Sequence, residues 1–168
     1  LVTAGGGAVQ VAAACAAAGV VVGVASLTGI GLRMSELIIT LSGGSLFGAL
    51  VLTGLGSIVL GMGLPVTASY IVLVVLAGPA LQDLGLALIT AHLVVFWLSQ
   101  DSNVPPPVAL AAYATAGIAQ APPMRAGLQA WKFAKGLYLI PLLMVYSPGV
   151  LLQGSGVEIA LDILVALA

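Results

Sequence analysis

Hydrophobic residues dominate the chain, and its polar residues gather in a few short clusters. Residues 1–32 and 37–82 contain no charged side chain. Uncharged runs of this length exceed the roughly 20 apolar residues that cross a bilayer as a helix. The pattern predicts membrane-embedded helices, the first of them over about 8–32.

Residues 45–82 consist of two apolar arms, 45–61 and 67–82, joined by the sequence Gly-Met-Gly-Leu-Pro-Val. Glycine and proline interrupt helices, yet the joint carries no charge of the kind that marks a loop in water. Irregular backbone is tolerated at membrane depth only where protein or a water-filled cavity shields it. We therefore predict a re-entrant hairpin with a buried tip over 45–82. Two full spans joined by a tight turn are the alternative.

The stretch 85–121 contains two apolar runs, Leu86–Leu98 and Val108–Ala121, with a polar segment between them. The first run would extend about 20 Å as a helix, less than the roughly 30 Å of hydrocarbon in a bilayer. Three consecutive prolines, 105–107, follow the polar residues and forbid a continuous helix. The pattern predicts a discontinuous transmembrane helix whose unwound centre holds polar side chains and free carbonyls.

The segment 122–135 contains three of the four basic residues of the chain and no acidic residue. Cytoplasmic loops carry an excess of Lys and Arg, so we expect this segment on the cytoplasmic side, as an interfacial helix or a simple loop. The chain then crosses outward over 136–153 and continues into a short apolar segment, 157–168. With this orientation the hairpin opens to the outside, and Arg33 lies there against the usual charge rule.

Composition supports the membrane assignment and bears on partners. Apolar residues make up 61% of the chain and charged residues 5%, whereas a soluble domain is about one quarter charged. Lipid must therefore solvate much of the surface. The net charge of -1 gives no reason to expect nucleic acid as a partner. Because the chain opens at Leu1 and its last segment is too short to span, we expect 1–168 to be a single transport-core fragment of a longer protein.

The residues that could bind a ligand lie at the two breaks, and their pattern is not that of an enzyme active site. The sequence has no His-Glu-x-x-His, Cys/His cluster, Gly-x-Ser-x-Gly or Walker A pattern. Hydroxyls, carbonyls and helix ends at membrane depth suit a small cation such as Na⁺. The candidate Na⁺ ligands are Gly61, Gly63, Thr67, Ser102 and Asn103. Candidates for a substrate contact or a structural role are Ser99, Asp101, Pro105 and Pro106.

Two of these assignments have alternatives, and His92 also has two interpretations. Asp101 either binds the cation or caps the second half-helix, and its place beside prolines favours the cap. Thr67 at the hairpin tip can instead hydrogen-bond locally. His92 is interpreted as a packing residue, with a proton relay as the alternative.

At the two breaks the sequence resembles a known family. The segments that carry the resemblance are AAACAAAGVVVGV (12–24), LTGIGL (27–32), LGMGLPVTASYIV (60–72), GPAL (78–81), AHLVVFW (91–97) and SQDSNVPPPVALAAYATAGIA (99–119). In combination they are similar to the large membrane subunit of TRAP transporters, most of all the branch served by TAXI-type binding proteins. The similarity extends to about Pro148.

The resemblance implies an elevator-type secondary transporter of the ion-transporter superfamily, built from two inverted repeats, of which this chain looks like the second. It implies Na⁺ as the coupling ion and a small, carboxylate-type solute delivered by a periplasmic solute-binding protein. It also implies a small membrane subunit or a fused equivalent, in a bacterial or archaeal cytoplasmic membrane. A channel or passive pore is the alternative function.

Two positions depart from the pattern of this family. Val66 stands where the family often has a threonine at the hairpin tip, and Pro105 stands where it often has a threonine at the broken helix. Each change removes one hydroxyl, so a cation site here would depend more on backbone carbonyls.

Overall fold

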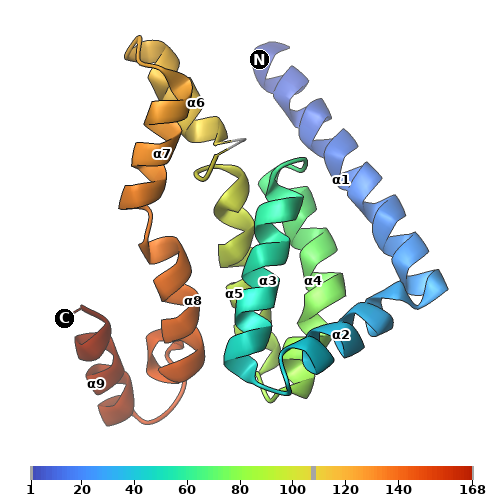
Figure 1. Cartoon of the computed structure of the whole chain (residues 1–168), viewed down its shortest axis with the longest axis vertical. Coiled ribbons are helices and arrows are strands. Elements are labelled where there is room, and N and C mark those ends of the chain that lie inside the picture. The colour runs from blue at the N-terminus through green and yellow to red at the C-terminus, as the bar shows by residue number, and fades with distance from the viewer. Residues whose placement is uncertain (1, 107–108, 168) are drawn as a thin grey trace.

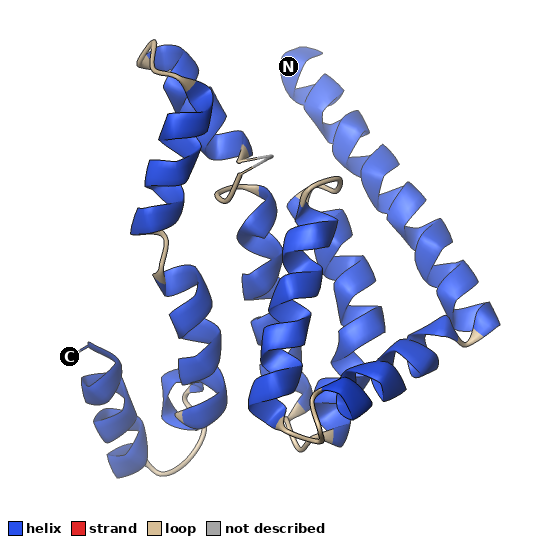
Figure 2. Ribbon diagram, in the orientation of Figure 1, coloured by secondary structure: helices blue, strands red, loops and turns tan. Residues whose placement is uncertain are grey.

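The computed structural model describes residues 2–106 and 109–167, and every regular element in those ranges is helical (Figure 2). The described part of the chain is therefore all-helical, as the sequence predicts.

The first two helices meet at a sharp corner. Helix α1 (Val2–Thr28) is followed by α2 (Ile30–Leu41), and their axes differ by 79° (Figure 1). Gly29 lies at the corner with a φ of 69°, a left-handed conformation that glycine adopts without steric cost. The expected segment 8–32 therefore divides, because its last residues belong to α2.

Residues 45–82 form a helical hairpin. Its arms are α3 (Leu46–Gly61) and α4 (Val66–Asp83). The hydroxyl of Ser45 caps α3 by accepting a hydrogen bond from the Gly48 amide at 3.4 Å. Pro65 precedes α4 in an extended conformation, which suits the fixed φ of proline at a helix start. That the hairpin is re-entrant stays a prediction.

The helix over 85–121 is discontinuous. Helix α5 (Leu88–Leu98) continues into a 3₁₀ turn, η1 (Ser99–Ser102), and the second half, α6 (Leu110–Ile118), begins only after the proline-containing linker. Pro107 lies outside the described residues. Ala109, the residue before α6, has a φ of 40°, a left-handed conformation that is costly for a residue with a Cβ.

The chain then turns back along its own path. Helix α7 (Pro123–Phe133) packs against α6, and α8 (Gly136–Tyr146) continues from it and packs against α5 (Figure 1). A short turn, η2 (Pro148–Leu151), leads to α9 (Gly156–Leu167). The turn between α6 and α7 lies at the same end of the molecule as the start of α1.

The acidic residues near the C-terminal end serve local structure. Glu158 accepts hydrogen bonds from the backbone amide and hydroxyl of Ser155, both at 2.8 Å, in the reciprocal arrangement of a capping box. Asp162 of α9 accepts from the Gly149 amide of η2 at 2.8 Å. A Cβ on Gly149 would come within 2.7 Å of the Asp162 carboxylate, so only glycine fits there.

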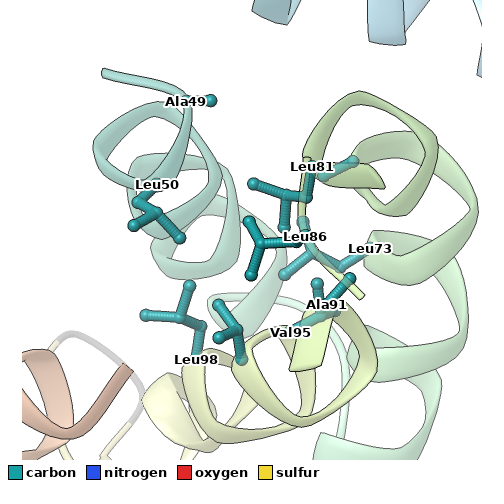
Figure 3. Packing of buried hydrophobic residues seen from close by; sticks show 10 residues of the cluster. Ala49, Leu50, Leu73, Leu81, Leu86, Ala91, Val95 and Leu98 are labelled. Carbon is teal, nitrogen blue, oxygen red and sulfur yellow. The ribbon is translucent and has the colours of Figure 1, made fainter. Parts of the chain in front are cut away.

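The hydrophobic core lies between α3, α4 and α5. Its residues are small or medium-sized aliphatic side chains, which let the three helices approach closely (Figure 3). The cluster consists of Ala49, Leu50, Leu73, Ala77, Leu81, Leu86, Ala91, Val94, Val95 and Leu98. This core fixes the hairpin against the first half of the broken helix.

By length and composition, α4 is the one helix among the described residues that suffices alone to cross a membrane, and the bent pair α1–α2 would make a second. Helix α3 is apolar but shorter, with 16 residues, or about 24 Å. Short helices are expected where spans are interrupted, because each half covers only part of the bilayer.

The close approach of α7 to the linker predicts that Gly127→Val destabilises the protein. A Cβ at Gly127 would lie 3.1 Å from both Pro106 Cγ and Tyr113 Cε1, and overpacking of this kind costs about 1–3 kcal/mol. Gly117→Val in α6 is the matched control, because no atom lies within 4 Å of its Cβ position. Thermal unfolding in detergent should give a lower midpoint for Gly127→Val. Equal midpoints for the two variants would contradict the close approach.

Candidate functional site

The two breaks meet inside the helical assembly. The 3₁₀ turn η1 packs against both arms of the hairpin, α3 and α4. In Figure 1 the chain after η1 and the loop between α3 and α4 lie at a similar height. Polar groups that the sequence places far apart are therefore neighbours around η1.

The centre of this region is the side chain of Asp101, which is only 2% exposed. Its Oδ2 atom accepts a hydrogen bond from the Ser57 hydroxyl of α3 at 2.6 Å. Its Oδ1 atom accepts a hydrogen bond from the Tyr138 hydroxyl of α8 at 2.9 Å. Each carboxylate oxygen thus has one side-chain donor, and the two donors come from different helices.

The hydrogen bonds extend beyond the carboxylate to α7. The indole Nε1 of Trp131 donates to the Tyr138 hydroxyl at 3.2 Å, while that hydroxyl donates to Asp101. The resulting network links Trp131, Tyr138, Asp101 and Ser57. It joins α7, α8, η1 and α3, so it fixes the break relative to three other helices.

The capping interpretation of Asp101 is wrong. Helix α6 begins at Leu110, and the residue before it, Ala109, supplies no side-chain cap. Asp101 instead lies within η1, on the other side of the linker. The linker separates Asp101 from the start of α6, so the carboxylate makes tertiary contacts instead.

Prolines leave carbonyls without their helical donors at both breaks. In a helix the carbonyl of residue i accepts from the amide of residue i+4, and proline has no amide hydrogen. Pro65 is four residues after Gly61, and Pro105 is four residues after Asp101. Pro106 stands in the same relation to Ser102. These carbonyls therefore supply oxygen at the ends of the hairpin arm and of the interrupted helix.

Buried hydroxyls line the same region. Ser57, Ser69 and Ser99 are each 0% exposed. Ser99 donates to the Val95 carbonyl at 2.7 Å. Ser69 lies one turn into α4, and its Oγ atom has no hydrogen-bond partner among the described residues. A buried hydroxyl in this condition has capacity for a ligand or a water.

The other predicted site residues differ in position. Gly61 is buried, whereas Gly63 and Thr67 are exposed at the hairpin tip. Asn103 is half-buried; its Nδ2 donates to Gln100 Oε1 at 3.4 Å, and its carbonyl accepts from the Ala111 amide at 3.1 Å. The carbonyl of Asn103 is thus engaged by α6.

The remaining predicted residues belong to the linker. Pro105 is buried, and Pro106 is half-buried where α7 approaches the linker at Gly127. The side chain of Ser102 lies outside the described part of the chain.

His92 lies away from this network. Its Nδ1 atom is 2.8 Å from the Tyr70 hydroxyl of α4. The Tyr70 ring also makes an edge contact with Phe96, with ring centroids 5.8 Å apart. The pair holds α4 against α5, in line with the packing interpretation of His92.

Sequence reasoning missed Ser57, Tyr138 and Trp131. Ser57 is one of two hydroxyl residues within the apolar arm α3, one helical turn before Gly61. Tyr138 and Trp131 resemble the aromatic residues that commonly lie at a membrane interface. The available signal was the cost of an uncompensated Asp101 in an apolar segment, which requires donors from elsewhere.

The geometry defines a class of protein. Apolar helices that surround a helical hairpin and a helix broken at a buried carboxylate are typical of membrane transport proteins with discontinuous helices. Residues 1–150 match the model of the family described as the tripartite ATP-independent periplasmic transporter, DctM component. The chain belongs to this family, which confirms the resemblance to the large subunit of TRAP transporters.

Membership has direct consequences. The DctM family is a family of membrane-located secondary transporters and not of enzymes. Comparisons with curated proteins and with solved structures give no match. The TAXI-type branch stays a prediction.

The contacts of Asp101 predict that Asp101→Ala destabilises the protein. The variant leaves the half-buried Tyr138 hydroxyl without its acceptor, and an unpaired polar group costs about 1–3 kcal/mol. The Ser57 hydroxyl keeps the Gly54 carbonyl as an acceptor. Asp83→Ala, which removes an exposed carboxylate at the end of α4, is the control. Thermal unfolding should give a clearly lower midpoint for Asp101→Ala than for Asp83→Ala. Indistinguishable midpoints would show that the carboxylate is not held as described.

Proposed function

We propose that the chain forms the ion-coupling part of a Na⁺-driven secondary transporter for a small carboxylate solute. The observation that carries this proposal is the meeting of the two breaks around buried Asp101, where prolines remove the helical donors of backbone carbonyls. The cation would bind between the end of α3 and η1, with the carbonyls of Gly61, Asp101 and Ser102 as its nearest candidate ligands.

The donor set favours a monovalent cation. Carbonyls and hydroxyls are hard, neutral oxygen donors, and the partial negative charge at helix C-termini adds to their attraction. Asp101 is the one carboxylate at the break, and both of its oxygens already accept hydrogen bonds. Ca²⁺ sites commonly combine several carboxylates, so the low charge of this site suits Na⁺ better.

The solute and partners are proposed from the family. A tripartite transporter has further components besides this one. We expect a periplasmic solute-binding protein to deliver the solute, and a small membrane subunit or fused equivalent to complete the membrane part. Transport by an elevator movement of the hairpin and broken helix is part of the same proposal.

The proposed site predicts that Na⁺ stabilises the complete transporter. NaCl should raise the unfolding midpoint in detergent, whereas choline chloride at equal ionic strength should not, because a ligand that binds only the folded state stabilises it by mass action. At a Na⁺ concentration 100 times the dissociation constant the gain is about 2.7 kcal/mol.

Variants locate this effect. Asn103→Ala, which removes a polar side chain beside the carbonyls that lack helical donors, should reduce the Na⁺-dependent gain. Thr40→Ala in α2 is the control and should retain it. Equal unfolding midpoints of the wild-type protein in NaCl and in choline chloride would contradict Na⁺ coupling. An unchanged Na⁺-dependent gain in Asn103→Ala would show that Na⁺ binds away from this break.

The charge distribution predicts the orientation in the membrane. In a Cys15→Ala background, a cysteine at Arg125 near the α6–α7 turn should resist membrane-impermeant thiol reagents added outside intact cells, because Lys- and Arg-rich segments stay in the cytoplasm. A cysteine at Gly44, in the connection before α3, should react. The opposite labelling pattern would invert the orientation.

A further inference from the structure

The hydrogen bonds to the Asp101 side chain restrict the position of a backbone carbonyl in the proposed ion site. Asp101 contributes two groups: a side chain fixed by Ser57 and Tyr138, and a main-chain carbonyl that lacks its helical donor because of Pro105. Both groups are attached to the same Cα atom. Any contact that fixes the direction of the carboxylate therefore also restricts the direction of the carbonyl.

The anchoring donors come from distant parts of the chain. Ser57 is 44 residues and Tyr138 37 residues from Asp101. η1 is a short 3₁₀ turn of four residues, and such turns have poorer hydrogen-bond geometry than an α-helix. Its own backbone holds it weakly, so its position depends on the contacts of its side chains.

The two anchors differ in how readily they can be released. The Ser57 hydroxyl has one proton but two acceptors within reach, Asp101 Oδ2 at 2.6 Å and the Gly54 carbonyl at 2.7 Å. If α3 moved away from η1, the Ser57 proton would keep an acceptor in its own helix. Tyr138 has Asp101 as its acceptor, and Trp131 supports it by donating to the same hydroxyl.

We propose that Tyr138 and Ser57 are positioning residues for the coupling ion, which act through Asp101. The hydrogen bond from Tyr138 holds the break against α8 throughout. The hydrogen bond from Ser57 holds the break against the hairpin arm α3 and can be released. This proposal rests on the proposed Na⁺ site for its functional consequence. The hydrogen-bonded clamp itself is a claim about the protein alone and is tested separately.

The first experiment measures the clamp without any ion. A cysteine at Val104, a half-buried position in the linker, is introduced into the complete transporter in a Cys15→Ala background, and its rate of reaction with a thiol reagent is measured in detergent without Na⁺. Tyr138→Phe should raise this rate at least about threefold, because loss of a hydrogen bond to a charged group frees η1. Ser57→Ala should raise it as well.

The matched control is Tyr146→Phe. It makes the same chemical change in the same helix, but at an exposed residue at the end of α8. The labelling rate of this variant should equal that of the parent protein. If Tyr138→Phe and Tyr146→Phe label at the same rate, the clamp is overturned whatever Na⁺ does.

The second experiment measures the ion. The Na⁺ concentration that gives half of the maximal thermal stabilisation should rise about fivefold or more in Tyr138→Phe and stay within about twofold in Tyr146→Phe. A purely structural role would lower the midpoint of unfolding without Na⁺ but leave the half-saturating concentration unchanged. That outcome would overturn the positioning role.

The two measurements separate the proposals. Faster labelling in Tyr138→Phe together with weaker Na⁺ binding supports the whole inference. Faster labelling in a transporter that Na⁺ never stabilises supports the clamp and overturns the Na⁺ assignment, and with it the positioning of that ion.

Discussion

A carboxylate buried among apolar helices has to find hydrogen-bond donors, and the arrangement of this protein follows from that requirement. Asp101 is almost fully removed from solvent, and its two oxygens are served by one donor each. An unpaired charge in such surroundings would cost several kcal/mol. The hairpin arm α3 and the returning helix α8 therefore have to approach η1 closely enough to place their hydroxyls on it.

Proline acts at both breaks by the same chemical means. It ends the regular hydrogen bonding and removes the amide that would have served a carbonyl four residues earlier. The affected carbonyls belong to Gly61 in the hairpin and to Asp101 and Ser102 in the interrupted helix. In lipid such groups would be too costly to leave exposed, and Gly61 and Asp101 are both buried. In the proposed function a cation replaces the missing donors. Val66 and Pro105 carry no hydroxyl, so at these two positions the backbone supplies the oxygen.

The outer surface is as informative as the centre. Large aliphatic and aromatic side chains are exposed along α1, α3 and α7, including Leu27 at 91% and Phe133 at 88%. A protein in water would not present so much apolar surface, whereas lipid or other parts of a transporter can cover it. The hydrogen-bonded carboxylate of Asp101 lies instead in the interior, within η1.

The sequence by itself determined the class of protein and the places where its helices are interrupted. Both depend on local properties: the length of apolar runs, and the inability of proline and glycine to continue a helix. The family resemblance was available for the same reason, since it lies in the segments around the breaks. The corner at Gly29 could not be predicted from the sequence. This glycine is one of many in a segment of small residues, and nothing local distinguishes it.

Only the tertiary structure decided which groups serve Asp101. The sequence favoured a local role as a helix cap, but α6 starts beyond the linker, and the donors come from residues 44 and 37 positions away. Ser57 and Tyr138 are ordinary residues within apolar segments, and no local pattern connects them. Their roles arise from the packing of α3 and α8 around η1, and packing of that kind depends on the whole chain.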